Sequence, residues 1–283
     1  MATRRVLSGF GYLYQRAYMR LIMMIVGYLL AILVGISLGL LGSGGSILSV
    51  PILVYVMGVS PVLATAYSLF AVGVSALVSG VHKARTGLVD FAKVGWFGLP
   101  AVVAVLVTRL WLMPALPDSW TCMGVLVTKN ALVMGVFALV MIMAAWRMIK
   151  PLTAPLNPNA QTPPWLLVGV GLGIGALAGF VGAGGGFLWV PALLFMARLP
   201  MPKAIGTSLF IVALQSLIGF AGDLARQPLD LPLMFGFTAC ALMGVWLGHR
   251  LSVRLRADAL KTYFGYFVAL MGVYILLREA LGN

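Results

Sequence analysis

Charged side chains are scarce in this sequence: Asp, Glu, Lys and Arg make up only 9% of its 283 residues. A soluble domain carries about 25% charged and about 45–50% apolar residues, whereas 62% of this chain is hydrophobic. The mean hydropathy is +1.07. These values exclude an ordinary soluble domain and predict an integral membrane protein. A span takes about 20 mostly apolar residues, so the chain has room for about eight to ten spans and for no separate catalytic domain.

Cysteine and histidine are equally rare, with two of each. Cys122 and Cys240 lie in different halves of the chain without CxxC spacing, which predicts neither a disulfide nor a metal or redox site. His82 and His249 stand near polar flanks and do not suit a haem held by two histidines. HExxH and GxSG motifs are missing as well. We therefore predict a protein that is not an enzyme and that uses no metal or cofactor.

Acidic residues number only six. They are Asp90, Asp118, Asp223, Asp230, Asp258 and Glu279. Each falls at or beyond the end of an apolar run, which disfavours proton coupling through a carboxylate buried in the membrane. Asp90 and Asp230 precede later apolar runs and are predicted to cap the helices that begin there.

Positive charge is in excess, because 19 Lys and Arg against six acids give a formal net charge of +13. The cations lie in the gaps between apolar runs, where the positive-inside rule and attraction to anionic lipid place them. Membrane lipid, and not nucleic acid, is therefore the expected partner of this charge. A basic N-terminal segment, residues 1–20, precedes the first apolar run. That run, 21–41, is too long for the core of a cleaved signal peptide and is predicted to remain as a helix.

The apolar runs fall into two sets of five, separated by a polar, Pro-rich linker at residues 150–164. The first set covers about 21–41, 46–57, 61–80, 94–113 and 124–147; the second covers about 165–182, 186–197, 203–221, 232–249 and 261–278. Glycines, prolines, serines and an aspartate recur between the sets in one constant register without gaps, so that Gly35 corresponds to Gly175 and Asp90 to Asp230. The sequence therefore predicts an all-α membrane protein of two homologous repeats, 21–149 and 165–283, with about four to five membrane helices each.

A glycine cluster interrupts each repeat at the same place: GSGGSILSVP begins at Gly42 and GAGGGFLWVP at Gly182. Each glycine inside a helix costs up to about 1 kcal/mol, so the clusters predict a broken helix followed by a short re-entrant or half helix. The N-terminus of the second piece presents unpaired N–H groups to an anion. The candidate substrate-binding backbone is Gly42, Ser43, Gly44, Gly45, Ser46, Gly182, Ala183, Gly184, Gly185 and Gly186. Close helix packing is the alternative role for such glycines.

Small hydroxylated residues follow each break, in ATAYSLF from Ala64 and AIGTSLF from Ala204. They offer Ser68, Thr207 and Ser208 as donors to a substrate, with Gln215 as a weaker candidate further along the second segment. The alternative is that each hydroxyl bonds a carbonyl of its own helix, as serine and threonine commonly do in membrane helices.

Two basic groups are candidates for coupling or for attracting an anion. His82 titrates near physiological pH but lies at a helix end, where an interfacial role is the alternative. Lys129 follows one to two turns of expected helix, from where its side chain can also reach the headgroups.

Together these residues resemble the TauE/SafE family of sulfite and organosulfonate exporters. The resemblance rests on the duplicated GxGG(G/S)xxxVPxL pattern, the AxxxSL element, and His82 followed by Gly87, Val89 and Asp90, and it extends from about residue 21 to 280. It implies a bacterial inner-membrane permease that moves small sulfur-containing anions, typically outward. The sequence departs from the family at Tyr67, where Thr is frequent, and at Gly222, which stands where His82 stands in the first repeat.

The expected function is secondary transport of a small anion by alternating access around one central site between the two breaks. An anion channel and a carrier of another small organic acid are the alternatives. Charge bias does not choose between parallel repeats of four spans and inverted repeats of five, so both topologies stay open.

Overall fold

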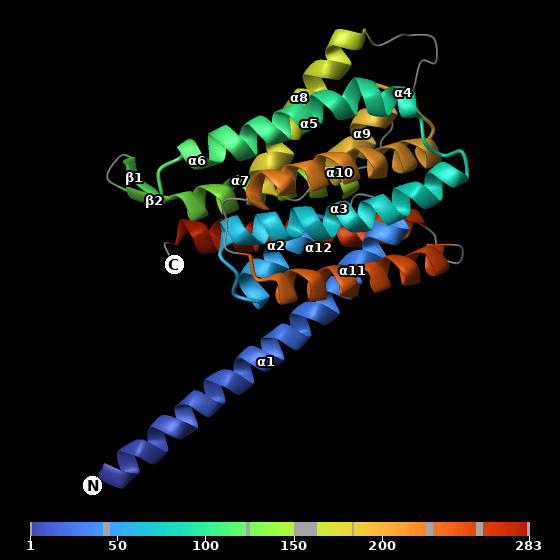
Figure 1. The fold of residues 1–283 in the computed structure, drawn as a ribbon. Helices are drawn as coiled ribbons and strands as arrows, with labels where there is room; N and C mark the ends of the chain where they lie inside the picture. The colour runs from blue at the N-terminus through green and yellow to red at the C-terminus, as the bar shows by residue number, and fades with distance from the viewer. Residues whose placement is uncertain are drawn as a thin grey trace.

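The structure, a computed structural model, describes residues 2–41, 46–122, 125–149, 163–182, 184–224, 229–252 and 257–281 (Figure 1). Its elements in chain order, with η for a π-helix, are α1 (Ala2–Leu41), α2 (Ser49–Pro51), η2 (Ile52–Val56), α3 (Pro61–Arg85), α4 (Phe91–Lys93), η3 (Val94–Gly98), α5 (Leu99–Val107), η4 (Thr108–Leu112), α6 (Met113–Ala115), β1 (Ser119–Cys122), β2 (Val125–Thr128), α7 (Lys129–Ile149), α8 (Pro164–Val181), α9 (Gly186–Phe195), α10 (Met201–Leu224), α11 (Leu231–Ser252) and α12 (Ala257–Ala280). The described chain is thus almost entirely helical.

Six helices in the described ranges are long and apolar enough to cross a membrane. They are Leu21–Leu40, Pro61–Arg85, Phe91–Ala115, Lys129–Trp146, Met201–Leu224 and Leu231–Leu251. Two further apolar helices, Ser46–Val56 and Trp165–Val181, are shorter. The chain is therefore a multi-pass membrane protein, although fewer helices meet this criterion than the eight to ten spans that composition allows.

Two details correct the sequence prediction. α1 is a single helix of 40 residues that continues through the basic N-terminal segment, and its N-terminal part stands clear of the bundle (Figure 1). The strands β1 and β2 form an antiparallel hairpin in which Ser119 pairs with Thr128, where a helix was expected to begin near residue 124. The β-branched Val125, Val127 and Thr128 favour this extended pairing over a helix.

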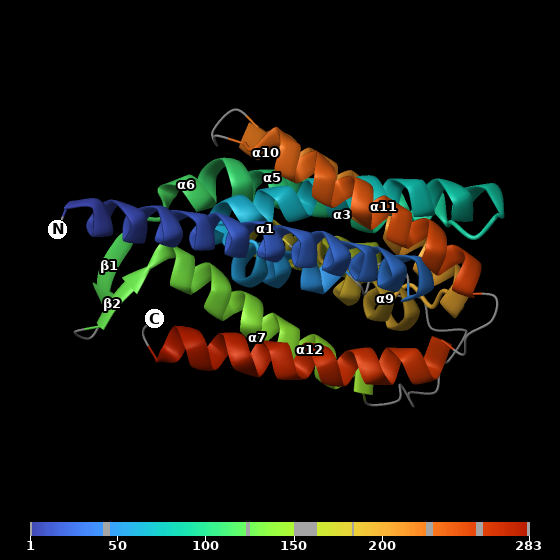
Figure 2. The same cartoon turned by 90° about the horizontal axis from the view of Figure 1, so that it is seen from below.

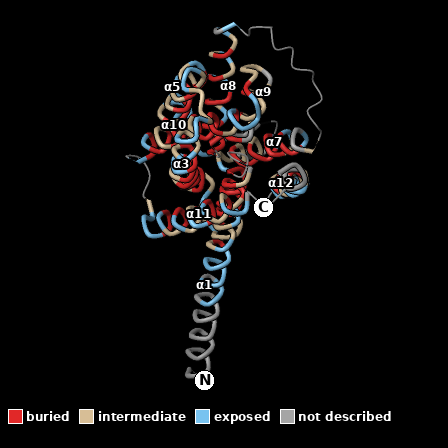
Figure 3. The backbone as a smooth tube through the Cα atoms, turned by 90° about the vertical axis from the view of Figure 1, so that its right-hand side faces the viewer, coloured by how far each residue is buried: buried red, intermediate tan, exposed pale blue. Residues whose placement is uncertain are grey.

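Helices α3 and α10 form the centre of the bundle (Figures 1 and 2). In the apolar part of both helices, 67% of the residues are buried inside the protein, whereas the corresponding share is 33–44% in the other four candidate spans (Figure 3). A Cβ on Gly73 would lie 2.9 Å from the Leu217 side chain, and one on Gly80 would lie 3.1 Å from Phe210. Because the second contact is later in α3 and earlier in α10, the two helices run antiparallel.

Two outer pairs, α1 with α11 and α5 with α8, are held together by glycines. A Cβ on Gly35 of α1 would lie 2.9 Å from the Cα of Gly244 in α11, next to the Ala241 carbonyl. A Cβ on Gly175 of α8 would lie 2.6 Å from the Cα of Ala101 in α5. Gly35 corresponds to Gly175, and Ala101 to Ala241, in the repeat register. These glycines let the backbones approach closely, as small residues do in membrane helix pairs.

Two glycine-to-alanine substitutions in α8 should change the stability of the protein in opposite directions, because only one of the glycines lies against α5. Gly175→Ala should destabilise the protein by about 1–3 kcal/mol, because the new methyl group meets the α5 backbone. Gly173→Ala, in the same helix, should be neutral or stabilising by up to about 1 kcal/mol, because nothing lies within 4 Å of its Cβ position and alanine favours the helix. Thermal unfolding of the purified variants in detergent measures both. Equal effects would show that the α5–α8 approach is looser than described.

Asp90 and Asp230 cap helices, as the sequence predicts. The Asp90 carboxylate accepts from the Lys93 N–H (3.1 Å), and the Asp230 carboxylate accepts from the Leu233 N–H (3.1 Å). The backbone N–H of Asp90 donates to the Thr207 hydroxyl (3.0 Å), and that of Asp230 donates to the Tyr67 hydroxyl (2.7 Å). The Tyr67 and Thr207 hydroxyls therefore play the same structural role, since each accepts a hydrogen bond from the backbone N–H of a capping aspartate.

Candidate anion-binding site

The second glycine cluster separates α8 from α9. The N–H of Gly182 donates to the Ala178 carbonyl (2.8 Å) and ends α8, and α9 begins at Gly186. Gly182, Gly184 and Gly185 have φ angles of +74°, +67° and +61°. This left-handed region costs other residues roughly 1–2 kcal/mol each, so the sequence needs glycine here.

The break packs directly against the central helix pair. A Cβ on Gly182 would lie 2.6 Å from the Thr65 Cα in α3, and one on Gly184 would lie 2.8 Å from the Ser216 hydroxyl in α10. The Gln215 side-chain amide of α10 donates to the Gly184 carbonyl. Backbone that has left helical geometry is thus buried in protein, which is the condition for such backbone at membrane depth.

Serine hydroxyls without partners occur on α3 and α10, the two helices that contact the break, and on α2. Five of them in the described part of the chain are fully buried and form no hydrogen bond: Ser49, Ser68, Ser75, Ser79 and Ser216. The Gln215 carbonyl oxygen is also unpartnered. A buried polar group without a partner costs about 1–3 kcal/mol, so a row of them needs a compensating ligand or water.

A buried ion pair lies at one end of this row. Arg109 of η4 is 1% exposed, and its Nη1 donates to the Asp223 carboxylate (2.9 Å) and to the Thr65 hydroxyl (3.0 Å). Asp223 is 8% exposed and lies in the last turn of α10. Thr65 lies four residues, or about 6 Å, inside the start of α3. The pair is therefore inside the membrane-spanning part, close to one of its ends.

The sequence places each acid at or beyond the end of an apolar run, and the structure adds that Asp223, in the last turn of α10, is buried. Asp223 was judged by its position near the end of an apolar run, but α10 continues through it and the fold covers it. The sequence does contain a signal for Arg109, because a lone arginine between apolar residues in VAVLVTRLWLM is costly in a membrane unless it is paired or functional.

The predicted glycine residues are covered only in part. Ser46 is fully buried at the start of the short helix that ends at Val56, and Gly186 is buried at the start of α9. Five other predicted residues of the two clusters lie outside the described residues: Gly42, Ser43, Gly44, Gly45 and Ala183.

The predicted hydroxyl donors do not meet at one point. Ser68 is near the Thr65 end of α3, whereas Thr207 and Ser208 are near the opposite end of the antiparallel pair. The Ser208 hydroxyl donates to the Ile205 carbonyl (2.8 Å), and the Thr207 hydroxyl accepts from Asp90. At 1.5 Å per residue, Ser68 and Ser208 are roughly 20 Å apart along the helices, so one small ligand cannot touch both.

The remaining candidates, Gln215, His82 and Lys129, also differ in place. Gln215 lies at the break. His82 lies in the last turn of α3, with its ring centroid 5.1 Å from that of His249. Lys129 begins α7 directly after the hairpin, rather than one to two turns into a helix, and its N–H donates to the Asp118 carbonyl (3.0 Å). Only Gln215 therefore contacts the break.

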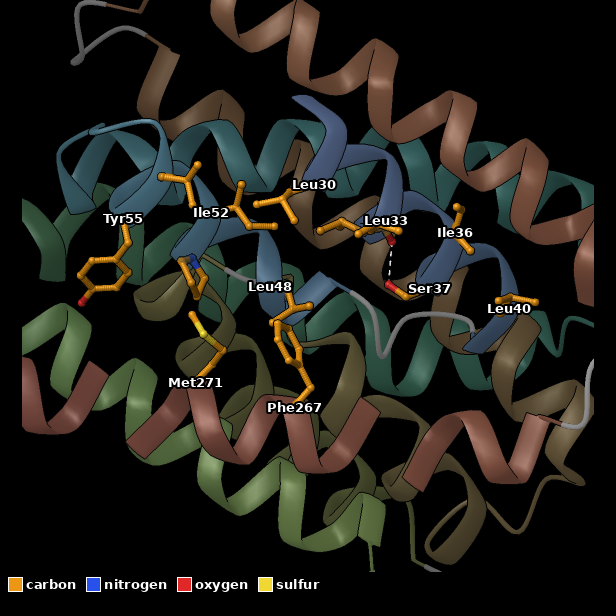
Figure 4. A pocket seen from close by; sticks show the side chains of 13 residues that line it. Leu30, Leu33, Ile36, Ser37, Leu40, Leu48, Ile52, Tyr55, Phe267 and Met271 are labelled. Atoms are coloured by element: carbon orange, nitrogen blue, oxygen red, sulfur yellow. Dashed lines mark hydrogen bonds between the residues drawn. The ribbon is translucent and has the colours of Figure 1, made fainter. Parts of the chain in front are cut away.

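An apolar cavity of about 420 Å³ lies elsewhere, between α1, the α2–η2 segment and α12 (Figure 4). Its hydroxyl groups come from Ser37 and Tyr55. The Ser37 hydroxyl donates to the Val34 carbonyl (2.7 Å), and the Tyr55 hydroxyl donates to the Glu279 carboxylate (3.2 Å). Its remaining walls are hydrocarbon, which suits apolar matter and not an anion.

Beside Gly182 and Gly184 the fold brings together two groups of a kind that recognises anions, the Ser216 hydroxyl and, through Thr65, the Arg109 guanidinium. Within the described ranges, no group of three or more His, Cys, Asp or Glu residues can hold a metal ion.

Comparison with known proteins identifies this chain as similar to membrane transporters. The family profile described as "Sulfite exporter TauE/SafE" matches residues 27–275. A "Probable membrane transporter protein" of Xylella fastidiosa (strain Temecula1 / ATCC 700964) is 35% identical over 254 residues, covering 87% of this chain and 92% of the relative. A relative of that description from Methanocaldococcus jannaschii is 23% identical over 268 residues, or 88% of this chain and 95% of its own length. No solved structure matches. These relatives are named as transporters and not as enzymes.

Proposed function

The chain belongs to the TauE/SafE family of membrane transporters, and from this premise and the buried break at Gly182–Gly186 we propose that it exports small sulfur-containing anions. Sulfite, thiosulfate and small organosulfonates are the proposed substrates, and a bacterial inner membrane is the proposed location. The observation that carries the anion site is a break of left-handed glycines against a row of unpartnered, fully buried hydroxyls. Partly unwound helices at a repeat interface are where secondary transporters bind anions.

The proposed architecture is a pair of inverted repeats. Its support is that contacts recur when each residue is replaced by its counterpart in the other repeat: α1 pairs with α11 as α8 pairs with α5. Helices α3 and α10, which the repeat register relates to each other, run antiparallel and pair together. Of the two topologies open from sequence, inverted repeats account for this antiparallel pairing.

The proposed central site lies between α3 and α10. Ser75 and Gln215 are counterparts in the repeat register, and each lies between the Gly73–Leu217 and Gly80–Phe210 contacts along its helix. They would therefore stand next to the axis that relates the repeats, which is where alternating access requires a site open to each side in turn. Ser216, beside Gly184, is the neighbouring donor.

Removal of the unpartnered hydroxyls tests this site. Ser75→Ala and Ser216→Ala should leave the free energy of unfolding unchanged or raise it, because each removes a buried group without a hydrogen bond. If the hydroxyls bind substrate, each variant should weaken sulfite binding about threefold to tenfold. Binding is measured by titration calorimetry on the purified protein, and export by sulfite flux in proteoliposomes.

Ser37→Ala is the matched control, because its hydroxyl is also buried but is bonded within its own helix. We expect it to bind sulfite with the wild-type affinity. Wild-type binding by both Ser75→Ala and Ser216→Ala would contradict the central site.

An anion channel is distinguished by counterflow. A carrier should show saturable sulfite flux that is accelerated by a second substrate on the opposite side of the proteoliposome membrane. Flux that neither saturates nor responds to the opposite side would favour a channel instead.

A further inference from the structure

We propose that Arg109 is an oxyanion-binding residue on the route to the central site, and that it captures the ligand through its Nε and Nη2 edge. This inference rests on the proposed transport function, and it places a second anion contact where neither the family profile nor the names of the relatives assign one.

The evidence is an unused half of a buried guanidinium. Nη1 makes both hydrogen bonds of Arg109, to Asp223 and to Thr65. Nε and Nη2 have no partner, although the side chain is only 1% exposed. A guanidinium is always charged and carries five N–H donors in a fixed plane, so leaving this edge unbonded in a buried place is costly.

The shape of the free edge defines the ligand. Nε–H and one N–H of Nη2 point the same way and form a fork that matches two oxygens on one atom. Sulfite, sulfonate and carboxylate groups present such a pair of oxygens, whereas chloride presents a single centre. The ligand class is therefore an oxyanion, and a halide should gain little from the fork.

The position of Arg109 connects it to the break. Thr65 accepts a hydrogen bond from Arg109 and packs against Gly182, the last residue of the α8 cap. Ser68, with its unpartnered hydroxyl, is three residues further along α3 toward Ser75. An anion released from Arg109 would thus find hydroxyl donors leading toward the centre of the bundle.

Neutralising Asp223 should change anion affinity in a direction that distinguishes an anion site from a purely structural ion pair. Within the described part of the chain, Asp223 is the acidic group that pairs with the guanidinium, and its charge opposes an incoming anion. If the ion pair were purely structural, changing either partner would lower the stability of the protein. An anion site instead loses affinity when the arginine is changed and gains affinity when the aspartate is neutralised.

The experiment compares three variants of the full-length protein in detergent by titration calorimetry with sulfite, methanesulfonate, acetate and chloride. Arg109→Lys keeps the charge but removes the fork, and it should weaken binding of the three oxyanions by about tenfold. Asp223→Asn keeps an oxygen that accepts from Nη1 and should bind them severalfold more tightly. Arg278→Lys makes the same substitution in α12, where the guanidinium lies over the Tyr55 ring of η2. This variant should bind all four anions with the wild-type affinity.

Wild-type oxyanion affinity in Arg109→Lys, or weakened binding in Asp223→Asn, would overturn the proposal. If one of the two does not fold, the other decides, because each has its own expected direction. Failure of this inference alone is recognised when Ser75→Ala and Ser216→Ala weaken binding but the Arg109 and Asp223 variants do not behave as expected. Absence of binding by the folded wild-type protein to every anion would overturn the proposed function as well.

Discussion

Arg109→Leu should lower the free energy of unfolding by about 3–5 kcal/mol, one of the two largest stability effects that we expect in this protein. The substitution removes the guanidinium that binds the Asp223 carboxylate, which is only 8% exposed, and it also removes a donor to the Thr65 hydroxyl. An unpaired charge in the low-dielectric interior costs far more than the net attraction of the pair provides, because desolvation is no longer offset.

The double variant Arg109→Leu/Asp223→Leu is the control for this explanation. With both charges removed, no buried ion is left unpaired, and replacement by apolar side chains is often neutral. We expect most of the lost stability to return, as measured by thermal unfolding of the purified variants in one detergent. If the double variant is as unstable as the sum of the two single ones, packing and not charge is the main contribution of Arg109.

Gly182→Ala is the second large effect. Its φ of +74° disfavours any side chain by roughly 1–2 kcal/mol, and the added Cβ would lie 2.6 Å from the Thr65 Cα. Backbone cannot yield as a flexible side chain can, so we expect a total loss of about 3–5 kcal/mol. Because Thr65 also bonds Arg109, the variant should lower anion affinity as well.

Gly58→Ala and Gly87→Ala are the matched controls, because they isolate the backbone cost. Their φ angles, +72° and +70°, are nearly the same as that of Gly182, but nothing lies within 4 Å of either Cβ position. Each should lose only about 1–2 kcal/mol and keep the wild-type anion affinity. Unfolding and sulfite titration are measured on all three variants. A Gly182→Ala protein as stable as the two controls would show that the break does not press on α3.

Local features of the molecule were predictable because local chemistry fixes them. Glycines clustered between two apolar runs predict a change of backbone direction, and Gly182, Gly184 and Gly185 are left-handed in the structure. An aspartate just before an apolar run predicts a cap, and Asp90 and Asp230 accept from the N–H groups three residues later. Each of these inferences needs only the few residues around it.

The hydroxyl donors show where local reasoning ends. Ser68 and Ser208 occupy matching positions in the sequence, so equivalent roles in one site were a natural expectation. The antiparallel crossing of α3 and α10 places them near opposite ends, and only Ser68 is left without a partner. The helix direction is a property of the packed bundle and cannot be read from either segment alone.

The sequence by itself determined the membrane setting, the transporter family and the glycines that separate α8 from α9, because composition and glycine conformation act within a segment. The tertiary structure alone decided that Arg109 pairs with Asp223, 114 residues away, and that the Nε and Nη2 edge of its guanidinium is left without a partner. The physical reason is that desolvation and hydrogen bonding depend on which helices meet, and apolar runs of similar composition do not encode that by themselves.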